Sequence, residues 1–499
     1  MGEIKQERFK EASGEWFSNW PRALHAGSSK NVFPVGILGS SKKLPHIFVR
    51  LELFGFFGLA NLVDAYACSK NKDILPLYAS SGKKAICLKS DAKTLAEKRK
   101  AIAQIVKALA KDASKEIFLV LEDKSWLPAL DAGLDALYNY DSFRQYDLKK
   151  DLPVPRDLFV HILGVEKLDF SELNHIMNAV FFVRDLVHRP PEAKPPFVLA
   201  DIIRNEFSNR DLKASFKLLR GGDEEFEKMG LIKAVGSGDL IEHHFNKPVV
   251  LVGEYRHPGA KIKKPLALIG KGVCFDTGGY QVKPGDSMNT MKSDMAGAAT
   301  VFGVLRAASV LNLPLHIVAA APFVYNHISS SAYMPDGIYT AYNGKTVEIG
   351  HTDAEGRLIL ADVLSYVAKN YKPEFMIDVA TLTGACCVAL GLERAGIFVE
   401  PENIYSDKIL KLFMGVEEKT GEGYWPLPLQ ASYFEQLKSK LANMKNIGGR
   451  FGGAITAALF LKQFTENVPW WHLDIAGPGI ETPGFGVKSI LEVLKKYSL

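Results

Sequence analysis

The chain has 499 residues, which is more than a single hydrophobic core usually serves, so its length predicts two domains. Hydrophobic residues make up 47% and charged residues 23% of the sequence, as in an ordinary soluble globular protein. The net charge is only +5, with lysine and arginine dispersed among aspartate and glutamate. The composition therefore argues against a strongly basic surface for nucleic acid.

The cysteine content and the apolar runs bear on the compartment. The five cysteines are an odd number and include the adjacent Cys386 and Cys387, so we expect free thiols in a reducing compartment rather than a disulfide framework. Residues 1–6 lack the apolar core of a secretory signal, and the richest apolar run, residues 53–63, is too short to cross a bilayer. These features predict a cytoplasmic protein without a membrane partner.

The first third of the chain alternates between helical and strand patterns. Residues 95–113 have helical periodicity, and residues 116–123 have the composition of a buried strand. We therefore predict a smaller N-terminal α/β domain over residues 1–168.

A break and a helix follow this first domain. Prolines mark residues 151–156 as the break, and residues 171–187 have the pattern of a helix that ends before Pro190 and Pro191. We place a linker helix at residues 169–190.

The larger second domain is predicted over residues 191–499. Apolar strands alternate with helices, such as the one expected at residues 295–311, and this order favours an α/β fold with a largely parallel sheet and helices on both faces. The predicted strands lie at residues 248–253, 265–269, 315–321, 375–380 and 471–475.

Two short stretches of this domain, residues 271–294 and 351–358, concentrate acidic and basic side chains. Hard divalent cations prefer carboxylate oxygens, and four ionised acids would balance the charge of two such cations. The remaining positive charge suits an oxyanion that forms in a transition state, so the stretches are typical of a two-metal hydrolase. The residues concerned are Asp276, Asp294, Asp353, Glu355, Lys271, Lys283 and Arg357.

Each of these residues also fits a simpler interpretation. Asp353 and Glu355 stand two positions apart, so an extended segment directs both to one side, as metal ligands or as part of a solvated acidic loop. Asp294 precedes a helix and also fits an N-cap. Lys271 and Lys283 also fit exposed surface lysines.

The two stretches resemble signature blocks of the leucine aminopeptidase (cytosol aminopeptidase) family of dinuclear metallopeptidases. The resemblance covers roughly the last three-fifths of the chain, and the first 170 or so residues match no block. Three positions depart from the family pattern, because His351 replaces the usual Asn, Cys274 a usual Thr, and Asp336-Gly337 a common Gly-Asp. Further similar blocks lie at residues 379–385, 446–450, 453–456 and 472–477, with a weaker one at 184–191.

The resemblance implies a reaction and roles for its residues. It implies an aminopeptidase that removes an N-terminal residue through attack by a metal-bridging water, with zinc as the first choice of metal and manganese as the second. In this family Lys283 would polarise the scissile carbonyl, and Arg357, with Gly356 and Leu358, would hold a bicarbonate that acts as general base. The implied metal ligands are Lys271, as a neutral amine, and Asp276, Asp294, Asp353 and Glu355.

The resemblance also implies a substrate pocket and an assembly. An apolar pocket would favour leucine or a similar residue, although Gly479 stands where relatives can carry a bulky side chain. Relatives form hexamers, in which the N-terminal domain would shape access or assembly. The implied pocket residues are Met291, Thr381, Leu382, Gly384 and Ala476.

Two alternatives and one local question remain open at this point. The chain could be a non-catalytic structural or nucleic-acid-binding hexamer, or a narrower dipeptidase, for example on cysteinyl-glycine. Loss of a metal ligand would favour the former, but all five are present. His351 fits either a hydrogen-bond partner of a metal-bound acid or a solvent-facing loop residue.

Overall fold

The computed structural model divides into two compact units, Met1–Phe181 and Phe182–Leu499. The division falls within helix α5 (Ser171–His188), where a helix was expected at residues 171–187. The structure describes residues 171–210, 212–238, 246–399 and 406–498, and, before these, residues 32–36, 46–50, 74–78, 84–88, 94–110, 116–120, 129–136, 138 and 157–163.

The first unit contains a six-stranded sheet in the order β1-β2-β6-β5-β4-β3. Its inner strands pair in parallel and its edge strands pair antiparallel. Helix α3 (Leu95–Ala110) corresponds to the predicted helix, and α4 (Leu130–Asp135) packs against it. The strands are β1 (Val32–Gly36), β2 (His46–Arg50), β3 (Ile74–Tyr78), β4 (Lys84–Leu88), β5 (Glu116–Val120) and β6 (Asp157–Leu163).

Several predictions for this region lie outside the described residues. They concern the N-terminal residues 1–6, the apolar run, the proline-marked break, and the ends of the predicted helix and strand, at residues 111–113 and 121–123. The start of the predicted linker helix, at residues 169 and 170, also lies outside them.

The second unit is built on a nine-stranded sheet in the order β16-β15-β18-β14-β9-β11-β8-β7, with β10 beside β11. Strands β18, β14, β9 and β11 run parallel in its centre, and antiparallel pairs lie toward both edges. The strands are β7 (Ser215–Arg220), β8 (Val249–Arg256), β9 (Leu266–Gly270), β10 (Val273–Asp276), β11 (His316–Asn326), β14 (Phe375–Ala380), β15 (Arg394–Val399), β16 (Gly423–Leu427) and β18 (Trp470–Asp474).

The α/β class and the sheet flanked by helices are confirmed. Strands β9, β11 and β14 are buried along their whole length, as expected for central strands covered on both faces. A separate small sheet pairs β13 with β12 and β17. Its strands are β12 (Ile338–Thr340), β13 (Thr346–Glu348) and β17 (Met444–Lys445).

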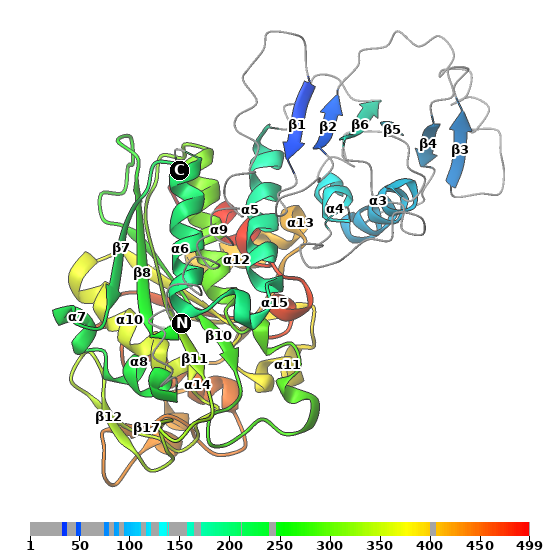
Figure 1. The fold of residues 1–499 in the computed structure, drawn as a ribbon. Coiled ribbons are helices and arrows are strands. Elements are labelled where there is room, and N and C mark those ends of the chain that lie inside the picture. Colours follow the sequence, from blue (N-terminus) through cyan, green and yellow to red (C-terminus); the bar gives the residue numbers. More distant parts are fainter. Residues whose placement is uncertain are drawn as a thin grey trace, which may run out of the picture. The chain divides into compact units, whose positions relative to one another are not determined.

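Helices cover both faces of the large sheet (Figure 1). Helix α9 packs on β9, β11 and β14 with α16 behind it, whereas α10 packs on the same strands together with α8 and α14. The principal helices are α6 (Pro196–Asn209), α8 (Gly230–Val235), α9 (Ala296–Val310), α10 (Gly356–Tyr371), α11 (Gly384–Leu390), α12 (Ser406–Gly415), α14 (Gly453–Lys462) and α16 (Val487–Ser498). Shorter helices are α7 (Glu224–Glu227), α13 (Glu417–Thr420), α15 (Pro478–Glu481) and the 3-10 turns η2 (Pro191–Ala193), η3 (Gly236–Gly238), η5 (Gly285–Met288), η6 (Met291–Ser293) and η7 (Ala431–Leu437).

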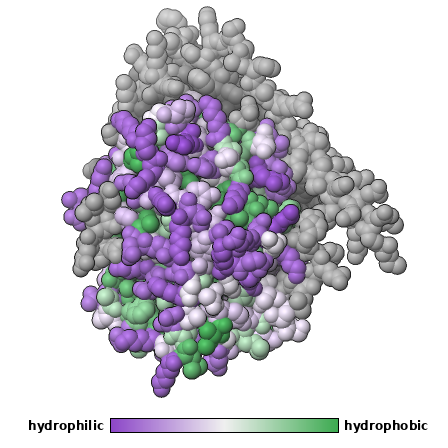
Figure 2. All heavy atoms as spheres, turned by 90° about the vertical axis from the view of Figure 1, so that its left-hand side faces the viewer, coloured by the Kyte–Doolittle hydropathy of each residue, from purple (hydrophilic) through white to green (hydrophobic). Residues whose placement is uncertain are grey.

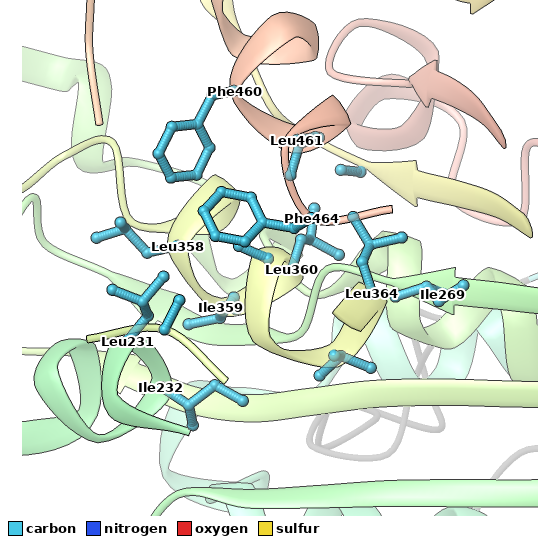
Figure 3. Close-up of a cluster of buried hydrophobic side chains, with 14 of the residues drawn as sticks. Leu231, Ile232, Ile269, Leu358, Ile359, Leu360, Leu364, Phe460, Leu461 and Phe464 are labelled. Carbon is cyan, nitrogen blue, oxygen red and sulfur yellow. The ribbon is translucent and has the colours of Figure 1, made fainter. Parts of the chain in front are cut away.

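Helix α10 is buried on nearly all sides and anchors one half of the core. Figure 3 shows its side chains Leu358, Ile359, Leu360 and Leu364 between residues of α8 and the end of α14. A helix that is apolar all round is stable only inside a protein. Because α10 begins at Gly356, this packing also holds the start of the helix in place beside the acidic residues.

The surface and the cysteines complete the description. The face in Figure 2 carries mostly hydrophilic side chains, with hydrophobic ones in small separate patches. Within the described part of the chain, no helix combines the length and apolar character needed to span a membrane. Cys274, Cys386 and Cys387 are free thiols.

Candidate functional site

The predicted acidic and basic residues meet beyond the carboxyl ends of the central strands. Lys271 directly follows β9, Asp276 ends β10, and Asp294 lies between η6 and α9. Asp353 and Glu355 lie in the loop that leads into α10. Open α/β sheets bind their ligands at this edge, so the topology explains how distant segments form one site.

Three of the carboxylates form a compact group. Ligand oxygens of Asp276, Asp353 and Glu355 all lie within 4.8 Å of one another. The ammonium group of Lys283 contacts two of them, at 2.7 Å from Asp276 Oδ2 and 2.6 Å from Asp353 Oδ1. Burial disfavours the charged form of Lys283, but the negative charges of Asp276 and Glu355 outweigh burial and raise its pKa.

Lys271 connects the group to Asp294. Its Nζ lies 2.7 Å from Asp294 Oδ1 and 2.9 Å from Glu355 Oε1, and it donates to Thr381 O at 2.9 Å. Burial disfavours the ammonium form, yet the charges of Asp294, Glu355 and Asp276 prevail, so the pKa of Lys271 is raised rather than depressed. Lys271 is therefore a buried ion-pair partner and not an exposed surface lysine.

Two buried carboxylate oxygens have no hydrogen-bond partner, Asp294 Oδ2 and Glu355 Oε2. Burial is the largest cause that raises the pKa of Asp294, opposed by Lys271 and reinforced by the charge of Glu355. Buried acceptors without donors are costly, and divalent cations would satisfy them. The donor set therefore fits the divalent metals that the sequence implies.

Asp294 is not an N-cap. Met295 occupies the N-cap position of α9, and no side chain caps that helix. The Asp294 carboxylate instead accepts from Thr381 Oγ1 at 2.9 Å in addition to its contact with Lys271.

A glycine and an asparagine shape the loop that carries Asp276. Gly278 has φ +89°, which disfavours other residues, and its N–H donates to Asp276 Oδ1 at 2.8 Å. Asn326, at the end of β11, donates through Nδ2 to the same oxygen at 2.8 Å and to Thr352 O at 3.1 Å. The sequence interpretation missed Asn326, and no pattern around it marked its role.

Arg357 provides a buried positive charge beside the carboxylates. Its Nη1 donates to Asn446 O at 2.9 Å, whereas its Nε is buried without a hydrogen-bond partner. Burial lowers the pKa of Arg357 to about 10, opposed by the charge of Glu355, so it remains charged at neutral pH. The N–H of Leu358 already donates to Glu355 O at 3.0 Å.

The residues expected at a substrate pocket are held mainly by Asp474, a residue that the sequence interpretation missed. Asp474 Oδ1 accepts from Leu382 N and Ala476 N, both at 3.2 Å, and Oδ2 accepts from Thr383 Oγ1 at 2.7 Å. One carboxylate thus joins the loops after β14 and β18. Met291 lies in η6, and Gly384 is exposed at the start of α11.

His351 lies beside one of the acids. Its Nδ1 accepts the N–H of Asp353 at 3.1 Å, and the side chain is half-buried. Of the two interpretations, the hydrogen-bond partner of an acidic residue describes this contact better than a purely solvent-facing histidine.

The sequence comparisons identify relatives with one description. The model of the cytosol aminopeptidase family, catalytic domain, matches residues 181–490. A probable cytosol aminopeptidase of Syntrophotalea carbinolica is 40% identical over 376 residues, which cover 72% of this chain and 73% of that protein. Another, of Chlamydia caviae, is 38% identical over 400 residues, covering 77% and 76%.

A solved structure is similar over most of the chain. The bottromycin maturation enzyme BotP in complex with Mn has a TM-score of 0.75 and 28% sequence identity, over 90% of this chain and 98% of that one. The family match and the relatives agree with the buried acidic cluster at the sheet edge. The chain belongs to the cytosol aminopeptidase family of metal-dependent hydrolases.

Proposed function

We propose that this protein removes the N-terminal residue of peptides, with leucine or another apolar residue preferred. Two divalent cations per subunit would be held by Lys271 and by four acids, Asp276, Asp294, Asp353 and Glu355. The observation that carries the proposal is the buried acidic group with two unpartnered carboxylate oxygens, at the edge where α/β enzymes bind substrates.

When bound, the cations supply Lewis acidity, which makes a water nucleophilic at neutral pH and polarises the scissile carbonyl. The residues of the chain then provide position and charge. Lys283 holds its ammonium at the rim of the acidic group, with its side chain 13% exposed, where a substrate carbonyl can reach it. A fixed positive charge there stabilises the oxyanion of a tetrahedral intermediate.

Arg357 is the anion-binding residue of the proposal. Its guanidinium lies at the start of α10, and its buried Nε lacks a partner, which a bound anion would supply. A bicarbonate held by Gly356, Arg357 and Leu358 would accept a proton from the attacking water. Because Leu358 N–H is already engaged, the guanidinium would make the principal contact.

The leucine preference rests on the proposed pocket of Met291, Thr381, Leu382, Gly384 and Ala476. Apolar surroundings favour a leucine side chain, but a difference of one methylene group discriminates only about 10- to 200-fold. A series of substrates that differ in the first residue, compared by kcat/KM, measures the preference. Equal values for leucyl and lysyl substrates would contradict it.

The catalytic proposal is tested by chelation, followed by addition of zinc or manganese, with a leucyl chromogenic substrate. Activity should return with zinc or with manganese. Lys283→Ala should lower kcat by about 10²- to 10³-fold with both ions still bound, because it removes transition-state stabilisation. Asp353→Ala should lose both activity and metal, and Lys233→Ala, which removes an exposed lysine, should change neither. A wild-type protein that is inert with every metal would refute the proposal.

We further propose a cytoplasmic homohexamer. Large apolar side chains of the catalytic unit are exposed, including Val388 at 90%, Phe451 at 79% and Leu441 at 74%, and contacts between subunits would cover such residues. Light scattering should give a sixfold mass, and Val388→Asp should reduce it. A monomeric wild type would contradict this part of the proposal.

A further inference from the structure

Lys194 is a fully buried lysine whose three acceptors are all main-chain carbonyls. Its exposed fraction is 0%, and its Nζ donates to Leu186 O at 3.2 Å, to Val187 O at 2.8 Å and to Lys292 O at 2.5 Å. An ammonium group has three N–H donors whereas a neutral amine has two, so three acceptors favour the charged form.

A cation at this position is energetically costly. Burial lowers the pKa of Lys194 to about 7, an effect that the Cys274 thiol opposes and the charge of Lys292 strengthens. A buried charge persists only where surrounding groups compensate for lost hydration. At Lys194 the compensation comes from carbonyls that need its protons.

The proline pair after α5 explains two of these hydrogen bonds. In a continuing helix the carbonyls of Leu186 and Val187 would accept the N–H groups of residues 190 and 191. Pro190 and Pro191 have no N–H, so these carbonyls require another donor. Lys194 supplies it, and its charge lies at the negative end of the helix dipole.

The third hydrogen bond connects this helix end to the segment that precedes Asp294. Lys292 accepts from Lys194 through its carbonyl, and its own Nζ donates back to His188 O at 3.3 Å. Two ammonium groups therefore join α5 and η6 in opposite directions. Met291 in η6 accepts the N–H of Asp294 at 3.2 Å, so the same segment leads directly into the acidic site.

The position of the Asp294 carboxylate depends on this backbone. Its Oδ1 contacts Lys271 and Thr381, and its Oδ2 has no partner. Groups that orient a metal ligand affect metal affinity strongly, because ligands must lie within a few tenths of an ångström of their ideal places.

We propose that Lys194 is a positioning residue for the aminopeptidase reaction. By holding the Lys292 carbonyl against the end of α5, it places the Asp294 carboxylate and the Met291 side chain at the site. This inference rests on the proposed role of Asp294 as a metal ligand.

The test compares metal binding in Lys194→Met, which keeps the chain length and removes all donors. Chelator-treated protein is titrated with Mn²⁺ alone, by calorimetry. The affinity for one of the two ions should fall about 10- to 100-fold, while the other changes less than about threefold. With Mn²⁺ saturating, kcat should fall as well, because Asp294 is displaced. Lys194→Gln, which keeps two N–H donors, should lose less of both.

The matched control is Ser489→Ala. Ser489 is also 0% exposed, and its hydroxyl contacts Glu422 and Tyr424, away from the acidic residues. This variant should unfold at a lower temperature yet bind both ions as the wild type does. If Lys194→Met does not fold, Lys194→Gln carries the same comparison.

The outcomes separate the inference from the proposed function. A Lys194 variant that melts earlier, like Ser489→Ala, but binds both ions with wild-type affinity would overturn the positioning role and leave the function intact. A wild-type protein that binds no Mn²⁺ and cleaves no peptide would overturn the function itself.

Discussion

At Gly356 the backbone passes so close to the Lys271 side chain that no larger residue fits. A Cβ at this position would lie 2.5 Å from Lys271 Cε and 2.8 Å from its Nζ. The sequence marked Gly356 only as part of an anion pocket. The structure adds a packing reason, because this glycine leaves room for the lysine that pairs with Asp294 and Glu355.

Gly356→Ala should therefore displace Lys271 and lower kcat/KM about 100-fold, as expected for a misplacement of about 1 Å. Steady-state kinetics with a leucyl substrate measure the change. The control is Gly415→Ala, since a Cβ at Gly415 meets no atom within 4 Å, and it should keep wild-type activity. Full activity in the Gly356 variant would show that the lysine moves without consequence.

At the scale of elements, Asp362 joins α10 to two other segments. Its Oδ2 accepts the N–H groups of Leu231 and Ile232 in α8, at 2.9 and 3.0 Å, and its Oδ1 accepts Tyr342 N at 2.7 Å. Burial raises the pKa of Asp362 to about 7, although the three N–H donors oppose that shift.

This pKa predicts a stability that depends on pH. The unfolded chain releases the Asp362 proton near a pKa of about 3.9, whereas the folded chain keeps it up to about 7. The folded state then binds more protons between these values, so its stability should fall as pH rises from about 4 to about 7 and level off above.

Asp362→Asn cannot titrate, so the stability difference between wild type and variant should shrink from pH 5 to pH 8. Urea unfolding at both values measures it. A difference that does not change with pH would mean that the three N–H donors keep Asp362 ionised throughout.

Helices α6 and α9 are joined by a buried ion pair. Glu206 Oε1 lies 2.7 Å from Arg306 Nε and 2.6 Å from Arg210 Nε, and the side chains of Glu206 and Arg306 are 1% and 3% exposed. Removing one partner leaves an uncompensated buried charge.

Glu206→Ala should lower the free energy of unfolding by about 3 to 5 kcal/mol, measured by urea denaturation. Asp201→Ala is the control on the same helix, because its pair with Arg204 is partly exposed and worth about 0 to 1 kcal/mol. Equal losses in the two variants would contradict the importance of burial.

At the scale of the whole molecule, divalent cations should stabilise the fold. Four carboxylates gather at the site, and two of their oxygens are buried without donors. An ion that binds only the folded chain, present at 100 times its Kd, adds about 2.7 kcal/mol. Chelation should remove this increment in a urea titration, and Glu355→Gln should reduce it. Unchanged stability after chelation would contradict metal binding by this cluster.

The strands and much of the acidic site could be predicted from the sequence, because the signals are local. Residues 375–380 were expected as a strand and form β14, since a short apolar run between polar residues is visible without knowledge of its neighbours. Asp353 and Glu355 likewise stand two positions apart in one motif.

Only the tertiary structure reveals the residues that hold these groups. Asn326 reaches Asp276 across 50 positions of sequence, Asp474 reaches Leu382 across 92, and Lys194 reaches Lys292 across 98. A single asparagine, aspartate or lysine carries no periodic or spacing signal, and its partners are set by which strand ends the sheet brings together. The sequence by itself thus determined the kind of chemistry, and the folded sheet decided which side chains position it.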